Sequence, residues 1–315
     1  MRIRENKRKR NKTKKGFEFS FAWIFAMLIG AVIIFLAVYA SIKAINLGKF
    51  GEETAAAKEL TVYFQPFETK TATALKSSIV LAQETKISNF CEKEGDFGKQ
   101  KFSFSIQSGF FKKWKGTGKN ISESNKYIFS QKEEIGKKFY IFTMPFKMPF
   151  KVANLVIFSS KKYCFINAPE YIKNGLESLG LENVKMQNSI SLCSQEEKKV
   201  CFSGSCDIEV SGDESYGIII KEGKEIKYSG NLLYAGIFSE PEIYKCNVER
   251  LLKRQKKLVS TYIKQAGFLS SKCGSVPVSS LLGFSNILSS DFNQNFISEA
   301  EKLNEQNEGA ECPLW

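Results

Sequence analysis

The sequence predicts an α+β protein with an N-terminal transmembrane helix, a mainly antiparallel β region and a C-terminal helical segment. Three observations carry this prediction. An uncharged apolar run follows a basic N-terminus, short apolar or alternating runs fill the middle of the chain, and helical periodicity dominates its last quarter. The 315 residues, 43% of them hydrophobic, are enough to form a packed core behind a membrane anchor.

Residues 1–16 form a short basic tail that accounts for most of the chain's formal net charge of +13. Its only acidic residue is Glu5, and its basic residues are Arg2, Arg4, Lys7, Arg8, Lys9, Arg10, Lys12, Lys14 and Lys15. A nucleic-acid-binding face needs such charges clustered on a folded surface, whereas here they directly precede an apolar helix. We therefore expect no nucleic-acid partner and an N-terminus that stays in the cytoplasm.

Residues 17–44 are expected to form the transmembrane helix. Residues 21–42 read FAWIFAMLIGAVIIFLAVYASI and contain no charged residue. As a helix this run is about 33 Å long, enough to cross a hydrocarbon core of about 30 Å. Trp23 and Tyr39 stand near its two ends, where interfacial aromatic residues are common. The bulk of the chain is then expected to be extracellular, behind a single membrane pass.

The junction before this helix leaves three interpretations open. A secretory signal with a cleavage site at Val38-Tyr39-Ala40 is one, although its apolar core is longer than usual, and a plain uncleaved anchor is another. The third rests on a resemblance, because Lys14-Lys15-Gly16 before Phe17 and a long apolar helix resembles the class III signal of archaeal type IV pilin-like proteins. This resemblance implies cleavage after Gly16 and a mature N-terminus at Phe17.

The pilin-like family commonly has an acidic residue five positions after the cut, where this chain has Phe21. The chain as a whole is similar to single-span archaeal envelope proteins with a basic tail, a glycine junction and a helix rich in Phe and Trp. That second resemblance implies an envelope location and no particular activity.

The exported part is expected to begin with a helical or loop connector, residues 45–88, followed by a β-rich region, residues 89–232. Strand-length runs in that region include KFSFSIQ, KFYIF, NLVIF, YCFI, VCF and DIEV. A hairpin is predicted around Lys221-Glu222-Gly223-Lys224, and one helix is predicted from Ala168-Pro169-Glu170 to about Gly180.

Residues 233–315 are expected to be helical. Ser239-Glu240-Pro241-Glu242 has the pattern of a capping box with proline in the first turn, and Gly267 is the expected stop. On a helical wheel the apolar face contains Tyr244, Val248, Leu251, Leu252, Leu258, Val259, Tyr262, Ile263 and Ala266. The opposite face contains Glu249, Arg250, Lys253, Lys257 and Lys264. A second helix is predicted from Phe292, Phe296, Ile297, Ala300 and Leu303.

All eight cysteines follow the apolar helix, which predicts disulfides in an oxidising compartment. The candidates are Cys91, Cys164, Cys193, Cys201, Cys206, Cys246, Cys273 and Cys312. Cys246 falls on the charged face of its helix, so we expect it to be bridged, with Cys273 or Cys312 as nearby partners. Cys193 with Cys201 or Cys206 is a second expected bridge, and Cys164 could be a buried free thiol.

Several other motifs have a structural and a functional interpretation. Lys115-Gly116-Thr117-Gly118-Lys119 lacks the spacing and the hydroxyl of a phosphate-binding loop, so it is read as a connection between strands. Asn120-Ile121-Ser122 is a glycosylation acceptor pattern. The basic aromatic stretch 110–115 is expected to be a strand end with a solvated basic turn, and the alternative is contact with lipid or an acidic polymer. The repeat MPFKMPFK, residues 144–151, is expected to be a buried crossover outside helices and central strands, and the alternative is an exposed apolar loop for a partner.

Composition argues against familiar catalytic and metal sites. The chain has no histidine and no CxxC pair, which excludes Ser–His and Cys–His nucleophile pairs and histidine zinc sites. The acidic pairs Glu133-Glu134 and Glu196-Glu197 are expected to lie solvated in loops. We therefore expect no catalytic residue, metal or cofactor, although distant carboxylates could still form a glycosidase pair.

These observations favour a membrane-anchored, exported, non-catalytic binding or scaffolding protein of the cell envelope. Its expected partners are the membrane, through residues 21–42, and other envelope proteins. A minor pilin-like subunit processed after Gly16 and an anchored extracellular hydrolase are the alternatives.

Overall fold

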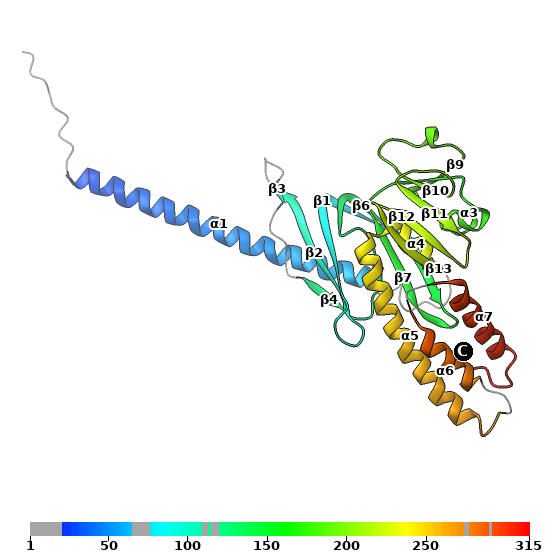
Figure 1. Cartoon of the computed structure of the whole chain (residues 1–315). Helices are drawn as coiled ribbons and strands as arrows, with labels where there is room; N and C mark the ends of the chain where they lie inside the picture. Colours follow the sequence, from blue (N-terminus) through cyan, green and yellow to red (C-terminus); the bar gives the residue numbers. More distant parts are fainter. Residues whose placement is uncertain (1–20, 65–75, 109–112, 115–119, 274–276, 290–291) are drawn as a thin grey trace, which may run out of the picture. The chain divides into compact units, whose positions relative to one another are not determined.

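A computed structural model gives the fold of residues 21–64, 76–108, 113–114, 120–273, 277–289 and 292–315 (Figure 1). The chain divides into two compact units, residues 1–49 and 50–315. Helix α1 (Phe21–Phe64) begins in the first unit. The second unit contains the strands and all the other helices described below.

Helix α1 contains the predicted apolar segment. Within the described residues, one helix is long and apolar enough to cross a membrane, and it covers Phe21–Ala44. Its side chains are exposed in the isolated chain, for example Phe21, Leu28 and Phe35. The helix continues to Phe64, so the first part of the expected connector is helical. The expected apolar helix is therefore present, with its apolar side chains turned to the surroundings.

The first sheet has seven strands in the order β3-β2-β1-β6-β7-β5, with β4 pairing on β2 (Figure 1). The strands are β1 (Lys76–Glu92), β2 (Lys99–Ser108), β3 (Lys113–Trp114), β4 (Ile121–Glu123), β5 (Ile128–Phe129), β6 (Glu133–Lys147) and β7 (Lys151–Ser159). The β region begins at Lys76, inside the expected connector. Residues 76–88 alternate weakly, but β6 pairs with residues 76–80 and 85–88, and β2 pairs with β1 from Thr85 on, so tertiary pairing decides their conformation.

The second sheet has six strands in the order β13-β12-β11-β10-β8-β9. They are β8 (Tyr163–Ile166), β9 (Val184–Gln187), β10 (Lys198–Cys201), β11 (Ile208–Gly212), β12 (Tyr216–Lys221) and β13 (Lys224–Ser229). Strand β8 pairs in parallel with both β9 and β10, so this sheet is mixed. Helix α3 (Glu170–Glu177), the predicted helix, makes the crossover from β8 to β9 that a parallel pair requires.

The predicted hairpin joins β12 to β13. Its two turn residues, Glu222 and Gly223, have φ angles of 53° and 70°. Both lie in the left-handed region, as the favoured two-residue hairpin turn requires. The hairpin prediction is therefore confirmed, including the position of its glycine.

The repeat MPFKMPFK forms a second hairpin between β6 and β7, which corrects the expected crossover. Pro145 lies inside β6, opposite Asn154 of β7. Strand β6 pairs with β7 along this stretch, but its ladder with β1 on the other side extends only as far as Phe142. Pro145 therefore lies where β6 has a neighbour on one side alone. A proline is tolerated there because its missing N–H breaks no second ladder. The four apolar side chains Met144, Phe146, Met148 and Phe150 are buried.

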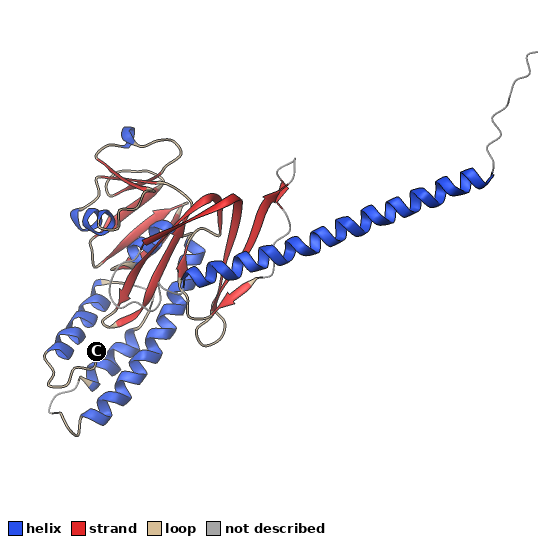
Figure 2. Ribbon diagram, turned by 180° about the vertical axis from the view of Figure 1, so that it is seen from behind, coloured by secondary structure: helices blue, strands red, loops and turns tan. Residues whose placement is uncertain are grey.

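Four helices complete the second unit (Figure 2). They are α4 (Leu232–Phe238), α5 (Pro241–Leu269), α6 (Val278–Ile287) and α7 (Gln294–Glu308). Helix α4 is buried along its whole length and contacts β7 of the first sheet and β12 and β13 of the second. Helix α5 contacts β1, β5 and β7, and α6 and α7 pack in succession beside it. The main core lies where these helices meet the two sheets.

The prediction of α5 and α7 is confirmed, but its capping details are wrong. Glu240 is the N-cap of α5 and makes no side-chain capping hydrogen bond. Its carboxylate accepts from Lys132 N instead, while Ser239 Oγ donates to Ala235 O. Gly267 does not stop the helix, which continues to Leu269. Helices α4 and α6 also fall in the region expected to be helical, although the sequence pattern did not delimit them.

Candidate functional site

The eight cysteines form four disulfides, and their connectivity differs from the expected one. The pairs are Cys91–Cys246, Cys164–Cys193, Cys201–Cys206 and Cys273–Cys312. Cys246 is bridged as predicted, but Cys273 and Cys312 bond each other. Cys193 bonds Cys164, which is therefore not a free thiol. Three of the four bridges join cysteines that are consecutive in the sequence, and only Cys91–Cys246 joins distant ones.

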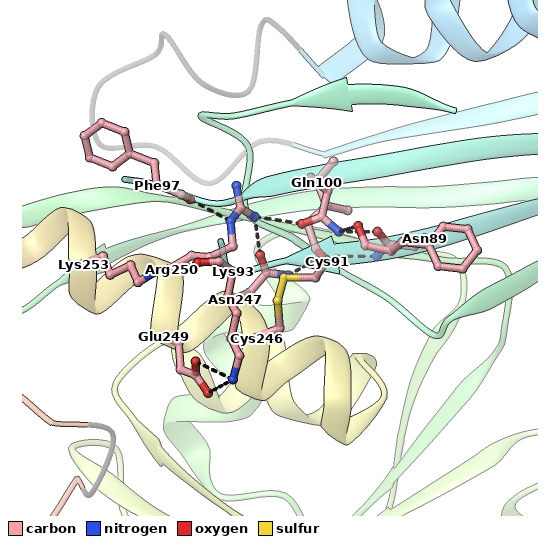
Figure 3. The surroundings of a disulfide bond; sticks show 12 residues. Asn89, Cys91, Lys93, Phe97, Gln100, Cys246, Asn247, Glu249, Arg250 and Lys253 are labelled. Atoms are coloured by element: carbon pink, nitrogen blue, oxygen red, sulfur yellow. Dashed lines mark hydrogen bonds and ion pairs between the residues drawn. A yellow bond between two sulfur atoms is a disulfide. The ribbon is translucent and has the colours of Figure 1, made fainter. Parts of the chain in front are cut away.

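The Cys91–Cys246 bridge joins β1 to α5 across 155 residues of sequence, with the two Cα atoms 6.1 Å apart (Figure 3). Closing a loop of that length removes about 5 kcal/mol of unfolded-chain entropy in the loop-closure model. Lys93 and Glu249 form an ion pair beside the bridge, with Nζ and Oε2 3.1 Å apart. The disulfide thus links the first sheet covalently to α5.

Arg250 lies next to this bridge and is completely buried, which corrects its expected place on the solvated face of α5. Its Nε donates to Phe97 O at 2.9 Å, and Nη2 donates to Ser124 O at 2.9 Å. Its Nη1 donates to Gln100 Oε1 and Asn247 Oδ1 (Figure 3). The same nitrogen donates to Lys126 O. No described acidic residue forms an ion pair with it. All three guanidinium nitrogens therefore donate hydrogen bonds to oxygens of uncharged groups, which come from residues 97–100, residues 124–126 and α5 itself.

The neighbouring amides extend this network into the first sheet. Asn247 Nδ2 donates to Ile128 O at 3.0 Å, and Asn89 Nδ2 donates to Ser130 Oγ at 2.8 Å. Gln100 donates in turn to the Asn89 side chain. Burial lowers the Arg250 pKa to about 10, which still leaves the group charged at neutral pH. The network holds α5 on β1, β2 and the start of β5.

Arginine usage is the sequence signal that could have revealed this region. Four of the six arginines lie in the basic tail, and the other two are Arg250 and Arg254, one turn apart on α5. The chain uses lysine for forty of its cations. A planar guanidinium has five N–H donors and can bind several converging carbonyls at once, which an ammonium group with one nitrogen cannot do. The two arginines outside the tail therefore point to buried positions where several acceptors meet.

Arg254 lines a cavity of about 360 Å³ between α5, β7 and the segment before β5. Two further cations, Lys126 and Lys151, contribute to its wall, and the described residues that line it include no acid. Tyr127 also lines the cavity and is 1% exposed. The Tyr127 hydroxyl lies within reach of the Arg254 side chain but donates to no described residue, and Arg254 Nε donates to none either. The cavity thus combines positive charge with buried donors that the protein leaves unused.

A second groove, of about 490 Å³, has the opposite character. Glu301 and Glu305 of α7 and Glu214 of the loop before β12 contribute to its wall, together with Lys147. All three glutamates are exposed. A glycosidase acid needs an enclosed, apolar setting to keep its proton, and this open groove offers none to these groups. Within the described residues no group of three or more His, Cys, Asp or Glu side chains could hold a metal ion.

The predicted solvated acids behave differently from one another. Glu133 and Glu196 are exposed, as expected, but Glu134 and Glu197 are buried. Ser160 N and Oγ donate to Glu134 at 2.8 and 2.6 Å, and burial raises the pKa of this carboxyl. Glu197 accepts from Lys185 and Ser194 N, which lower its pKa. Both acids bind turns of their own sheet, which is a structural role.

Lys221 is a buried cation that sequence analysis had placed in a plain hairpin. It is 4% exposed, and its Nζ donates to Ile237 O at 3.0 Å and to Ser239 O at 2.6 Å. These carbonyls end α4, where a positive charge is favourable. Burial lowers the Lys221 pKa to about 8. The side chain fastens the end of α4 to the second sheet.

The remaining candidates fall in different places. Gly16 and Phe17, the residues 115–119 and most of the stretch 110–115 lie outside the described residues. Trp114 is described in β3 and half-exposed, with Lys86 Nζ 5.7 Å from its ring centroid. Asn120 is exposed just before β4, so its glycosylation stays a prediction.

Comparisons with protein-family models, with curated proteins and with solved structures find no match to this chain. The functional argument therefore rests on the chemistry of its own residues.

Proposed function

We propose that this protein is a single-pass membrane protein whose disulfide-bonded domain lies outside the cell and binds or scaffolds other envelope components without catalysis. The observation that supports it most is the pairing of all eight cysteines in four disulfides, all of them after the apolar helix. Such bonds persist in oxidising compartments and are rare in the cytosol. The basic tail before the helix supports a cytoplasmic N-terminus.

The way the second unit is built also supports binding or scaffolding rather than chemistry. Its buried polar groups, Arg250, Lys221 and Glu134, make hydrogen bonds to the backbone and to neutral side chains that hold elements together. Catalytic groups would instead face a shared enclosed cleft. Other envelope proteins are the proposed partners, and nucleic acid is not among them.

The thiol content of the native protein tests this proposal. The protein is extracted from membranes in the presence of an alkylating agent, and its mass is then measured before and after reduction. We expect no alkylated cysteine before reduction and eight after it. Alkylation of most cysteines in the unreduced protein would contradict an extracytoplasmic location.

A minor pilin-like subunit, processed after Gly16, is the second candidate. The observation that favours it is the continuity of α1, which remains helical for 44 residues, well past the apolar segment. An uninterrupted helix of this kind suits a subunit whose apolar half is retained after processing. The intact mass of the purified protein decides between the two: loss of residues 1–16 supports the subunit, and an intact Met1 supports the plain anchor.

A further inference from the structure

We propose that the basic cavity between α5, β7 and the segment before β5 binds the anionic group, carboxylate or phosphate, of a small ligand. This inference names a ligand class for the binding role proposed above and rests on it. The ligand is of the size of a single sugar acid or a glycerol phosphate unit. Its recognition would centre on Tyr127, Lys151 and Arg254.

The charge of the cavity is the first argument. Lys126, Lys151 and Arg254 line it, and the described residues of the lining include no carboxylate. Arg250 adds a further cation nearby, with its Cζ 4.8 Å from the centroid of the Tyr127 ring. Lys257, on the same helix as Arg254, is paired with Asp96 of the loop between β1 and β2. A cavity whose charged lining residues are all cations favours an anion and disfavours a cation.

The unused donors are the second, independent argument. Tyr127 is 99% buried, so its hydroxyl cannot turn freely into bulk solvent, and although the Arg254 side chain is within reach, the hydroxyl donates to no described residue. Arg254 Nε is also buried and has no acceptor among the described residues. Leaving a buried donor without an acceptor costs about 1–3 kcal/mol, so such positions in a folded protein call for an explanation. One ligand oxyanion would accept from both groups.

The Tyr127 hydroxyl is suited to donate. Burial raises its pKa, and the charges of Arg254 and Arg250 and a hydrogen bond with Arg254 only partly oppose that rise, so the group keeps its proton at neutral pH. Arginine suits the same task because its planar fork matches carboxylate and phosphate oxygens. Arg254 is one of only two arginines outside the basic tail, which is consistent with a position where lysine would not serve.

The size of the cavity limits the ligand. About 360 Å³ lies at the lower end of the range for small-molecule sites, about 300–1,000 Å³. Asn125 and Asn154 add amide groups that could meet hydroxyls, and Val152 and Val156 add apolar surface. A charged group with a few hydroxyl-bearing carbons fits this mixture better than a bare ion or a long apolar chain.

Binding is tested by isothermal titration calorimetry on the purified full-length chain in detergent. The probes are D-glucuronate and glycerol 1-phosphate, with glucose and glycerol as neutral counterparts of similar shape. We expect at least one anion to bind about tenfold or more tighter than its neutral counterpart, and more weakly as salt is raised. Which anion binds tells carboxylate from phosphate. If neither anion binds better than its counterpart, the proposal is wrong.

Three variants locate the site. Arg254→Gln should weaken anion binding about tenfold or more, because it removes a charged donor. Tyr127→Phe should weaken it about three- to tenfold with little change in the melting temperature, since the hydroxyl donates to no described residue. Lys256→Gln, at an exposed position of α5 outside the cavity, is the control and should change nothing. Anion binding that survives Arg254→Gln unchanged would overturn the assignment.

Failure of this site and failure of the proposed location give different results. The titration uses purified protein and does not depend on which side of the membrane the domain occupies. Binding by a protein whose C-terminus proves to be cytoplasmic would keep the site and discard the location. An exported domain that binds neither anion would do the reverse.

Discussion

The guanidinium of Arg250 lies against the ring of Tyr127, with 4.8 Å between Cζ and the ring centroid, and both side chains are buried. Arg250 comes from α5 and Tyr127 from the segment that leads into β5, 123 positions earlier in the chain. The contact places a charged group and an aromatic face at the junction of helix and sheet. Tyr127 also lines the basic cavity.

Arg250→Lys should destabilise the second unit by about 2–4 kcal/mol. A lysine has three donors on one nitrogen, so it cannot reach Phe97 O, Ser124 O and Lys126 O together, and buried carbonyls would lose their partners. Denaturant unfolding followed by near-UV circular dichroism measures the change. Lys264→Gln, at an exposed position of the same helix, is the matched control and should stay within about 0.5 kcal/mol of the wild type. An equally stable Arg250→Lys protein would mean that the network contributes little.

Removal of the Cys91–Cys246 bridge should cost more than removal of the Cys201–Cys206 bridge. The first closes a sequence separation of 155 and the second a separation of 5, so the loop-closure model gives about 5 and about 2 kcal/mol. The double variants Cys91→Ser/Cys246→Ser and Cys201→Ser/Cys206→Ser are compared by thermal unfolding, oxidised and reduced. The first variant should melt well below the second when oxidised, and the difference should disappear on reduction. Equal melting temperatures in the oxidised state would contradict this ranking.

Lys221 should make the stability of the second unit depend on pH in the alkaline range. Its folded-state pKa, about 8, lies below its ordinary value of 10.5. The unfolded chain therefore binds more protons between pH 8 and 10.5, and the folded form gains stability as pH rises through that window. Relative to Lys221→Met, the wild type should gain about 2–3 kcal/mol between about pH 7 and about pH 10. Comparing the two proteins cancels the titration of the tyrosines, and a difference that stays constant with pH would contradict the assignment.

Local sequence patterns predicted the elements whose own residues specify them. The apolar segment of α1, helices α5 and α7 and the hairpin at Gly223 each have a clear period or a turn residue that needs a left-handed backbone. Strand β1 has no such pattern in its first half and depends on β2 and β6 for its hydrogen bonds. The parallel pairing of β8 depends in the same way on distant segments.

Local sequence patterns also could not predict which polar side chains of the second unit are buried, bridged or brought together. On a helical wheel Arg250 and Cys246 fall among charged residues, and only the sheet packed over that face reveals that they are buried or bridged. Tyr127 and Arg254 come from segments that meet only in the fold. Composition held one usable clue, since arginine is scarce outside the tail and both remaining copies lie at this junction.

The side of the membrane on which Trp315 lies tests the proposed location most directly. A reporter enzyme that is active only outside the cytoplasm is fused after Trp315, and one that works only in the cytoplasm is fused at the same position in a second fusion protein. We expect activity from the exported reporter alone, because the proposed topology has the basic tail inside and the apolar part of α1 across the membrane. Activity of the cytoplasmic reporter alone would contradict the extracytoplasmic location, and with it the proposed role in the cell envelope.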